Sequence, residues 1–471
     1  MKFYSLFQEK HGQYTRKERC VSIGKLVPLF LCSLVATIIL SFFLYFPYPL
    51  NPLTRCGFQQ MYAPVVGHQV SYFKIAHFFF YYGIANCDLF KGHWVADDKG
   101  SRYTDSSCLT IPESNNCFMQ GRKDDDFLKW RWKPDDCDLP RFDAKVFLDM
   151  VRGNKMAFIG DSVARNQLES LLCLLAQEEV PKDIYKDPED RLRIWNFRGH
   201  DFTLMTLWSG FLVVGDRKVI NGSSECYNLH LDKIDESWTT NLPTIDYAII
   251  AVEHWFFRPI YLYEGPNIVG CVYCYNSSIT NVGVIGAIHM TFRAAFKYVN
   301  DCSRCRGIVT VVRTFSPSHF ENGSWNTGGS CNRTSPIGEK EIDLGGEGWE
   351  LRKIQVEETE RARTEGDKKG KSFVIMDVTK AMLMRPDGHP EEFWGNNWLK
   401  GYNDCVHWCL PGPIDVWNEF LMAFLEIETG LISSYGSSLL ENTVYYLFIQ
   451  CPSVFHVDNR FFIAHLKDEE N

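Results

Sequence analysis

The sequence has no excess of positive charge, no internal repeat and, over one long stretch, no charged residue at all. Its 49 Lys and Arg residues are outnumbered by 58 Asp and Glu residues, and the formal net charge is -9. Because nucleic-acid binding favours a basic face, this balance argues against a nucleic-acid partner. The absence of a repeat excludes a repeat architecture. A chain of 471 residues is long enough for about two to three structural units.

The stretch without charge is residues 26–46, an uninterrupted apolar run that is long enough to cross a bilayer as a helix. The segment before it is rich in Lys and Arg, which predicts a cytosolic N-terminus. A cleaved signal peptide is the alternative, but it favours a shorter apolar region and a small-residue cleavage site, whereas Tyr45-Phe46-Pro47-Tyr48-Pro49 follows here. We therefore predict a cytosolic tail (1–25), a transmembrane signal anchor (26–46) and a stem (47–85), with the remainder in the lumen.

Cysteine is abundant, with 17 residues in the chain. A lumenal, oxidising compartment explains this density as disulfides. The pairs Cys271/Cys274 and Cys302/Cys305 have the spacing of zinc ligands, but the lumenal setting favours disulfides there too, so no metal site is predicted. The sequence also contains N-x-S/T sequons, each of which predicts a surface position if it is glycosylated, at Asn221, Asn276, Asn322 and Asn332.

The remainder divides by composition into a small block and a larger domain. Residues 86–143 are polar and rich in turn residues, and contain Cys87, Cys108, Cys117 and Cys137. Such a block needs disulfides or a packing neighbour to stay folded. Residues 144–430 read as an α/β domain, whereas 431–471 form a C-terminal extension without a clear pattern.

Apolar strands alternate with helical segments in the larger domain. Helices are expected directly after Ser162 and at about 286–299 and 349–364. This alternation predicts a parallel sheet covered by helices on both faces. The expected strands are Lys155–Ile159, Asp246–Val252, Ile308–Val312 and Phe373–Met376.

Gly160-Asp161-Ser162 stands where the first of these strands ends and a helix begins. Ligands of open α/β sheets bind at the carboxyl ends of the strands, and a helix N-terminus offers free backbone N–H groups that stabilise an oxyanion. Ser162 is therefore a candidate nucleophile. The alternative is that Asp161 or Ser162 only caps the helix.

Asp404 and His407 provide the base that a serine nucleophile needs. A spacing of three places both side chains on one turn, where the carboxylate can fix the imidazole tautomer. Cys405 and Cys409 flank the turn and would restrain it if they are oxidised. A surface pair or a helix cap is the alternative for a D-x-x-H pattern on its own. Together with the Gly-Asp-Ser element, the pattern predicts a Ser162–His407–Asp404 triad.

Two segments carry a family resemblance. Phe158–Gln167 and Asn403–Gly412 resemble the two signatures of the plant trichome birefringence-like family, whose members are wall polysaccharide O-acetyltransferases with an SGNH/GDSL-esterase-like catalytic domain. The four-cysteine block resembles the N-terminal domain of that family through Cys87–Phe90, Gly92–Val95, Trp130–Trp132 and Cys137–Asp143. The resemblance covers roughly residues 86–430, and its motifs occur in the family's order.

This resemblance implies roles for individual residues. Ser162 is the expected acyl-accepting nucleophile, His407 the general base and Asp404 its orienting partner. Gly160, Asp161 and Arg165 belong to the expected oxyanion and substrate site, although a salt bridge is the alternative for Arg165.

His254 and Trp255 lie in a segment that resembles the members acting on xyloglucan, although Glu253 stands where the family more often has Gly. Trp255 is either a sugar-stacking residue or a core residue. For His389, which lies in another matching segment, a structural or substrate-lining role is expected. The family also implies the disulfides Cys87–Cys137, Cys108–Cys173, Cys117–Cys409 and Cys331–Cys405.

The resemblance implies a Golgi O-acetyltransferase that modifies a cell-wall hemicellulose through an acetyl-serine, with xyloglucan side-chain galactose as the expected acceptor. Mannan or xylan is the alternative acceptor. A polysaccharide acetylesterase and a non-catalytic glycan-binding protein are the alternative functions. No bound cofactor is expected, but an acetyl donor is required, either acetyl-CoA or a derived donor supplied by membrane proteins. A cleft between the two lobes is expected to hold the glycan.

Overall fold

The computed structural model describes residues 87–220, 224–395 and 401–428. The expected tail (1–25), membrane span (26–46), stem (47–85) and C-terminal extension (431–471) lie outside these residues, as does Asn221. Within the described part, no helix is long and apolar enough to cross a membrane. The other three sequon asparagines, Asn276, Asn322 and Asn332, are exposed at the surface.

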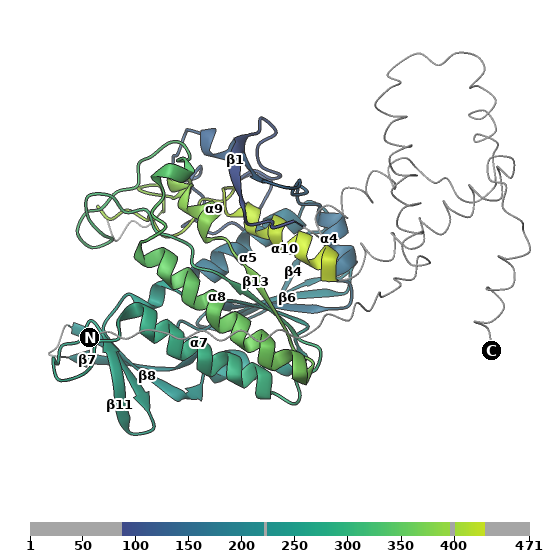
Figure 1. Ribbon diagram of the computed structural model, residues 1–471. Helices are drawn as coiled ribbons and strands as arrows, with labels where there is room; N and C mark the ends of the chain where they lie inside the picture. Colours follow the sequence, from purple (N-terminus) through teal and green to yellow (C-terminus); the bar gives the residue numbers. More distant parts are fainter. Residues whose placement is uncertain (1–86, 221–223, 396–400, 429–471) are drawn as a thin grey trace, which may run out of the picture. The chain divides into compact units, whose positions relative to one another are not determined.

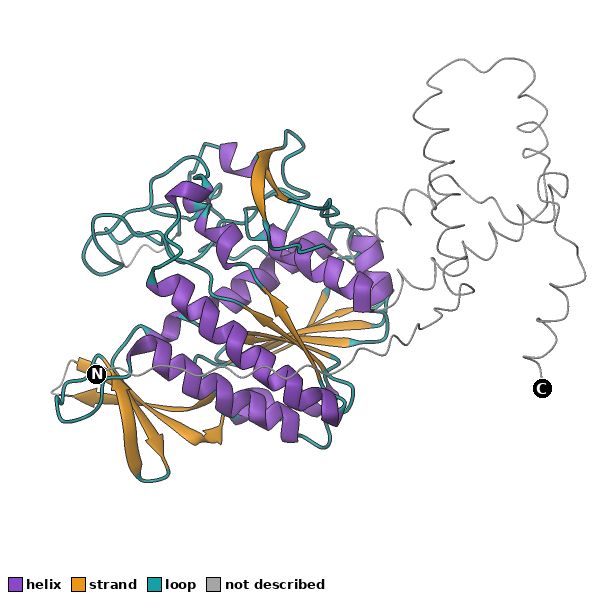
Figure 2. Cartoon of the chain, viewed as in Figure 1, coloured by secondary structure: helices purple, strands orange, loops and turns teal. Residues whose placement is uncertain are grey.

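A seven-stranded sheet forms the centre of the fold, in the order β13-β12-β9-β3-β6-β5-β4 (Figure 2). The first five strands in this order are parallel neighbours: β13 (Ser372–Met376), β12 (Val309–Arg313), β9 (Tyr247–Ala251), β3 (Lys155–Gly160) and β6 (Phe202–Trp208). The last two are antiparallel: β5 (Leu192–Phe197) and β4 (Lys182–Lys186). The predicted parallel sheet is therefore confirmed at its centre, but its antiparallel edge was not predicted.

Strand β3 shows why both faces of the sheet need helices. Its side chains alternate between the faces, as in any strand. Phe158 packs in one hydrophobic cluster with helix α5, and Ile159 packs in the other with helix α7. Both side chains are fully buried, and burial of such a side chain stabilises the fold by about 1.5–3 kcal/mol. The sheet thus has a hydrophobic core on each side.

Helices cover both faces of this sheet (Figure 1). The α5 cluster contains α4 (Ala144–Met150), α5 (Ser162–Leu175) and α10 (Asp415–Glu428). Helices α7 (Gly283–Asp301) and α8 (Glu347–Gly366) lie side by side in the other cluster. The short helices are α6 (Glu236–Thr239), η4 (Leu242–Thr244), η5 (His254–Phe256), η6 (Glu339–Glu341), η7 (Asp367–Lys369), α9 (Thr379–Leu383) and η8 (Pro386–Gly388).

A second sheet of four strands was not predicted from the sequence. Its order is β11-β10-β8-β7, and Leu229 and Leu262 from it pack in the same cluster as Ile288 of α7. Many of its other side chains face solvent, so its strands lack the continuous apolar runs that mark the central ones. The strands are β7 (Val213–Ile220), β8 (Ser224–Ile234), β10 (Ile260–Glu264) and β11 (Asn267–Val272).

The small N-terminal lobe contains the antiparallel pair β1 (Gly92–Ala96) and β2 (Trp130–Pro134), with η3 (Asp126–Leu128) before β2. Its Trp132 is fully buried in the cluster that also contains α5. Trp94 donates a hydrogen bond from Nε1 to the backbone oxygen of Ala381 in α9, at 2.8 Å. The lobe therefore shares its core with the α/β domain, which is the packing neighbour that its composition required.

Disulfides attach the lobe to the α/β domain at two points. The structure contains all four bridges that the family resemblance implied: Cys87–Cys137, Cys108–Cys173, Cys117–Cys409 and Cys331–Cys405. The two C-x-x-C pairs are also disulfides, Cys271–Cys274 and Cys302–Cys305. Cys226 is the free cysteine of the described part, and it is buried.

Candidate active site

Gly160 is the last residue of β3 and pairs with Ala251 of β9. A Cβ atom at Gly160 would lie 1.8 Å from the backbone oxygen of Ala251, so no other residue fits without moving the strands apart. Its own carbonyl oxygen accepts a hydrogen bond from the Ser209 N–H at 2.9 Å. Because Gly160 has no side chain, β3 and β9 can pair closely just before the chain turns into α5.

Asp161 links the start of α5 to the loop after β9. Its Oδ1 accepts a hydrogen bond from the Val163 N–H at 3.0 Å and so caps the helix. Its Oδ2 accepts from the N–H groups of Glu253 and His254, at 3.0 and 3.1 Å. Because both oxygens are engaged and the residue is 1% exposed, Asp161 is the helix cap and contributes to a substrate site only by holding these segments together.

Ser162 is the first residue of α5 and is half-buried. Its hydroxyl has no hydrogen-bond partner among the residues that the structure describes. It stands beside the first helical turn, whose N–H groups form the positive end of the helix dipole. The Asp161 cap engages the Val163 N–H, so the N–H groups of Ser162 and Ala164 are the ones that lack intrahelical acceptors. This position suits a nucleophile whose developing oxyanion needs donors.

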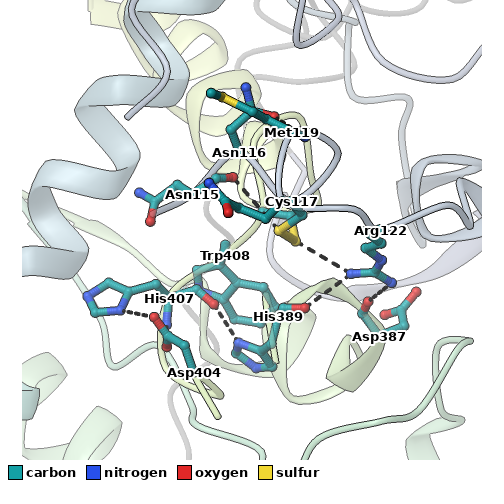
Figure 3. The surroundings of a disulfide bond; sticks show 12 residues. Asn115, Asn116, Cys117, Met119, Arg122, Asp387, His389, Asp404, His407 and Trp408 are labelled. Atoms are coloured by element: carbon teal, nitrogen blue, oxygen red, sulfur yellow. Dashed lines mark hydrogen bonds and ion pairs between the residues drawn. A yellow bond between two sulfur atoms is a disulfide. The ribbon is translucent and has the colours of Figure 1, made fainter. Parts of the chain in front are cut away.

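Asp404 and His407 form a hydrogen-bonded pair, with 2.8 Å between Asp404 Oδ2 and His407 Nδ1 (Figure 3). Asp404 Oδ1 accepts from the N–H groups of Val406 and His407 at 3.0 and 2.9 Å. Burial by itself would raise the pKa of Asp404, but His407 and these donors hold that pKa well below its usual range. A carboxylate at this position fixes the proton on Nδ1, which leaves the Nε2 lone pair of His407 free to act as a base.

The charge of Asp404 also acts on the imidazole. Burial would lower the pKa of His407, but the Asp404 carboxylate outweighs burial and raises it above its ordinary value of 6.5. The charges of Asp161 and Glu169 raise it further. His407 is therefore stabilised in the protonated form that a general base adopts during the reaction.

Asn166 joins the helix of Ser162 to the loop of His407. Its Oδ1 accepts a hydrogen bond from the Trp408 N–H at 2.8 Å, and its Nδ2 donates to the Trp408 carbonyl oxygen at 3.2 Å. Asn166 lies one helical turn after Ser162, so these bonds hold His407 against the start of α5. Among the described residues, no hydrogen bond joins the Ser162 hydroxyl to the His407 ring. Such contacts are often loose without substrate.

The small lobe holds the same loop from the other side (Figure 3). Cys117 is bonded to Cys409, two residues after His407. The Arg122 guanidinium donates to the backbone oxygens of His389 and Asp387 at 3.1 and 2.8 Å. The lobe thus helps to position the candidate base.

His389 is not available as a second base. Its Nδ1 lies 2.7 Å from the His407 carbonyl oxygen, and its Nε2 lies 2.7 Å from Nδ1 of His319. Its ring stacks on Trp408, with 4.1 Å between ring centroids, and the residue is 2% exposed. Both ring nitrogens are occupied, so His389 supports the His407 loop from within, as the expected structural role requires.

Arg165 follows Ser162 by one turn but is turned toward the β4–β5 connection. Its guanidinium donates to the backbone oxygen of Asp190 and lies 3.4 Å from that residue's Oδ2. It also lies over the Trp208 ring, at 5.3 Å from the centroid. Arg165 therefore forms the salt bridge that was the alternative to an oxyanion contact.

His254 and Trp255 occupy the loop after β9. Burial lowers the pKa of His254 to about 4, so the ring is neutral, and its Nε2–H donates to the Ser316 carbonyl oxygen at 2.9 Å. Trp255 packs against Trp208 with 5.5 Å between ring centroids, and both rings line a cavity of about 340 Å³. Trp255 is half-buried and lies at the wall of this cavity. It therefore packs partly as a core residue and partly lines a cavity, as a sugar-stacking residue would.

Glu253, at the start of the same loop, forms a buried ion pair. Its Oε1 accepts from the Arg313 guanidinium at 2.8 Å and its Oε2 from the Ser316 N–H at 2.6 Å. Sequence reasoning missed this pair, as it missed Asn166. Arg313, at the end of a buried strand, was the available signal, because a charged residue there needs a partner.

Comparison with known proteins identifies the family of the chain. Residues 139–424, more than half of the chain, match the GDSL/SGNH-like acyl-esterase (PC-Esterase) family found in Pmr5 and Cas1p, and residues 85–138 match the PMR5 N-terminal domain.

Full-length relatives extend the match. Xyloglucan O-acetyltransferase 4 of Populus trichocarpa is 57% identical over 411 residues, which cover 87% of this chain and 94% of that protein. Xyloglucan O-acetyltransferase 2 of Arabidopsis thaliana is 49% identical over 427 residues, covering 89% and 98%. Protein trichome birefringence-like 20 of Arabidopsis thaliana is 42% identical over 345 residues, 72% of each chain. The chain belongs to the GDSL/SGNH-like PC-esterase family, within its trichome birefringence-like proteins.

Proposed function

We propose that this chain is a xyloglucan O-acetyltransferase in which Ser162, His407 and Asp404 carry the acetyl transfer. The names of its relatives support the reaction and the acceptor. The observation that carries the residue assignment is the Asp404–His407 pair, held against the N-terminal end of α5 by the Asn166–Trp408 hydrogen bonds. The acceptor position is a hydroxyl of the side-chain galactose.

The first half of the proposed reaction loads the serine. The Ser162 hydroxyl attacks the carbonyl carbon of the acetyl donor and gives its proton to Nε2 of His407. The N–H groups of the first α5 turn that the Asp161 cap leaves free stabilise the tetrahedral oxyanion. The intermediate collapses, the donor's leaving group takes the proton from His407, and acetyl-Ser162 remains.

The second half transfers the acetyl group to the glycan. A sugar hydroxyl loses its proton to His407 while its oxygen attacks the acetyl-Ser162 carbonyl carbon. The second tetrahedral intermediate releases the serine oxygen, which takes the proton back from His407. The products are an ester on the sugar and a free Ser162 hydroxyl, which can react with another donor molecule. The donor is either acetyl-CoA or a derived donor that membrane proteins supply.

We place this reaction in the Golgi lumen, with the chain anchored as a single-pass type II protein by residues 26–46. The six disulfides of the described domain support an oxidising compartment. A fluorescent fusion of the full chain, viewed with a Golgi marker, tests the location. Protease protection of the C-terminal region in sealed vesicles tests the topology.

The activity test compares the full chain with its Ser162→Ala variant. Each is incubated with an activated acetyl donor and oligosaccharides of galactosylated xyloglucan, mannan or xylan, and the mass of each oligosaccharide is measured. We expect an acetyl mass gain on xyloglucan that is absent from the variant. Gain on mannan or xylan instead would change the acceptor, and free acetate without glycan gain would indicate an acetylesterase.

A further inference from the structure

Helix α5 is buried except along one narrow stripe. Of its residues Ser162–Leu175, only Ser162, Arg165 and Glu169 are half-buried, and all the others are buried. These three stand at positions i, i+3 and i+7, which share one face of a helix. The accessible stripe therefore begins at the candidate nucleophile and ends at a carboxylate that the triad does not use.

Glu169 has one occupied and one free oxygen. Its Oε2 accepts a hydrogen bond from the Asn115 side-chain amide of the small lobe, at 2.9 Å. In the described part of the chain, Oε1 has no hydrogen-bond partner and the carboxylate makes no ion pair. Arg165, the nearest candidate along the stripe, is engaged with Asp190 instead.

The position of this carboxylate relates it to the reaction centre. Seven residues of helix place the Glu169 Cα about 10 Å from that of Ser162. Long helical side chains lean toward the helix N-terminus, which brings the carboxylate back over the turn of Arg165. His407 is one of the charged groups acting on Glu169, and Glu169 in turn acts on His407. The free oxygen thus lies on the same face of α5 as Ser162, about two helical turns along.

The electrostatic setting favours a ligand that donates hydrogen bonds. Burial raises the pKa of Glu169 to about 7, although Arg165, His407 and the Asn115 amide oppose this rise, and Asp190 adds to it. An ionised carboxylate is an acceptor only, and the Oε1 of half-buried Glu169 is accessible to a donor from a ligand. Sugars present adjacent hydroxyl groups of this kind.

We propose that Glu169 is an acceptor-binding residue whose Oε1 accepts a hydrogen bond from a sugar hydroxyl next to the one that becomes acetylated. Asn115 of the small lobe holds the carboxylate in place, so the acceptor lies where the two lobes meet along the stripe. The ligand class is a neutral glycoside with neighbouring free hydroxyls. This inference rests on the proposed function, because it takes the sugar as the acceptor of acetyl-Ser162.

A binding experiment tests the claim without needing turnover. The full chain carrying Ser162→Ala is titrated calorimetrically with a galactosylated xyloglucan oligosaccharide, alone and combined with Glu169→Gln. Gln keeps the shape and an acceptor for Asn115 but loses the charge. Hydrogen bonds to charged groups are worth about 1.5–3 kcal/mol, so we expect the affinity to fall tenfold or more. Glu178→Gln, an exposed change just beyond α5, is the matched control and should leave the affinity unchanged.

A kinetic experiment distinguishes binding from a structural role. Glu169→Gln should raise KM for the oligosaccharide about tenfold, while the rate of acetyl-Ser162 formation from a small activated ester stays within about threefold. An equal loss in both quantities would place Glu169 in the framework of the triad and overturn the proposal. An unchanged KM and affinity would also overturn it.

The pH dependence of binding provides a test that needs no substitution at Glu169. Because the ionised carboxylate is the better acceptor, binding to the Ser162→Ala chain should strengthen as pH rises through about 7. Glu169→Gln should lose this dependence. Affinity that is flat across this range would contradict the proposal. If the oligosaccharide binds with this pH profile but the wild-type chain transfers no acetyl group, the proposed function fails while the binding site stands.

Discussion

Asn166 and Trp408 stand far apart in the sequence yet exchange two hydrogen bonds, and both are fully buried. Asn166→Ala would leave the Trp408 N–H and carbonyl groups buried without partners, which costs about 2–5 kcal/mol of the free energy of unfolding. His407 would shift with its neighbour, so kcat should fall about 100-fold. Denaturant unfolding and initial rates measure these two effects.

Asn196→Ala is the matched control for that substitution. At the antiparallel edge of the sheet, the Asn196 side-chain amide donates to the Phe202 backbone oxygen at 3.2 Å and to the Thr203 hydroxyl at 3.5 Å, and residue 196 is only half-buried. We expect a smaller loss of stability, about 1 kcal/mol, and an unchanged kcat. Equal kcat losses in the two variants would contradict a specific role for Asn166.

Asp404→Asn should lower kcat by about 10³–10⁴-fold, because the amide leaves the His407 proton on the wrong nitrogen. The pH profile carries the second signature. A base with a raised pKa gives a rate that increases as pH rises through that pKa, above 6.5 for His407. Without the carboxylate the pKa of His407 falls, so this increase in rate should occur at lower pH. Measuring kcat against pH tests both effects.

Glu392→Gln provides the charge control for Asp404, since Glu392 is exposed. Its kcat, and the pH range over which kcat rises, should match those of the unmodified chain. If kcat of the Asp404→Asn chain rises over the same pH range as kcat of the unmodified chain, His407 does not titrate as the base.

The Cys117–Cys409 bridge should stabilise both the fold and the site. It joins residues 292 apart in the chain, and replacing both cysteines by Ser should cost about 2–5 kcal/mol. The loop that carries His407 also loses its attachment to the small lobe, so kcat should fall. The Cys302–Cys305 bridge closes a loop of only three residues, and its double Ser variant should cost about 2 kcal/mol or less with kcat unchanged. Similar kcat losses in the two variants would contradict the positioning role.

The Glu253–Arg313 pair predicts a double-mutant cycle. Glu253→Gly would leave a guanidinium buried and unpaired, since Arg313 is 1% exposed. That should cost about 3–5 kcal/mol of the free energy of unfolding. Adding Arg313→Met should restore part of the loss, and denaturant unfolding of all four chains measures the coupling. No recovery in the double variant would show that the pair does not act as a unit.

The central strands were predictable because burial on both faces makes them short apolar runs. All five residues of β9 and of β12 are buried, and the sequence marks them as strands. Strand β4 is fully exposed, and its Lys182–Lys186 sequence has no such run. Its pairing depends on a neighbouring strand, which composition does not reveal.

Local spacing predicted the Asp404–His407 contact because three residues span one turn. The Asn166–Trp408 bonds depend on the fold, since no local pattern relates residues at this separation. The disulfide pairs came from the family resemblance, as spacing leaves many pairings open. For Arg165, the helix face was predictable from the spacing to Ser162. The direction of its side chain was not, because its partner Asp190 lies between β4 and β5, two strands that were not predicted from the sequence.

The acetyl-serine intermediate is the central claim of this account. The full chain is mixed with an activated acetyl donor in the absence of glycan, digested, and the mass of the peptide containing Ser162 is measured before and after a galactosylated xyloglucan oligosaccharide is added. We predict that this peptide gains one acetyl group and loses it as the oligosaccharide gains one, and that Ser162→Ala shows neither change. Acetylated oligosaccharide formed by the Ser162→Ala chain at the wild-type rate would contradict the account.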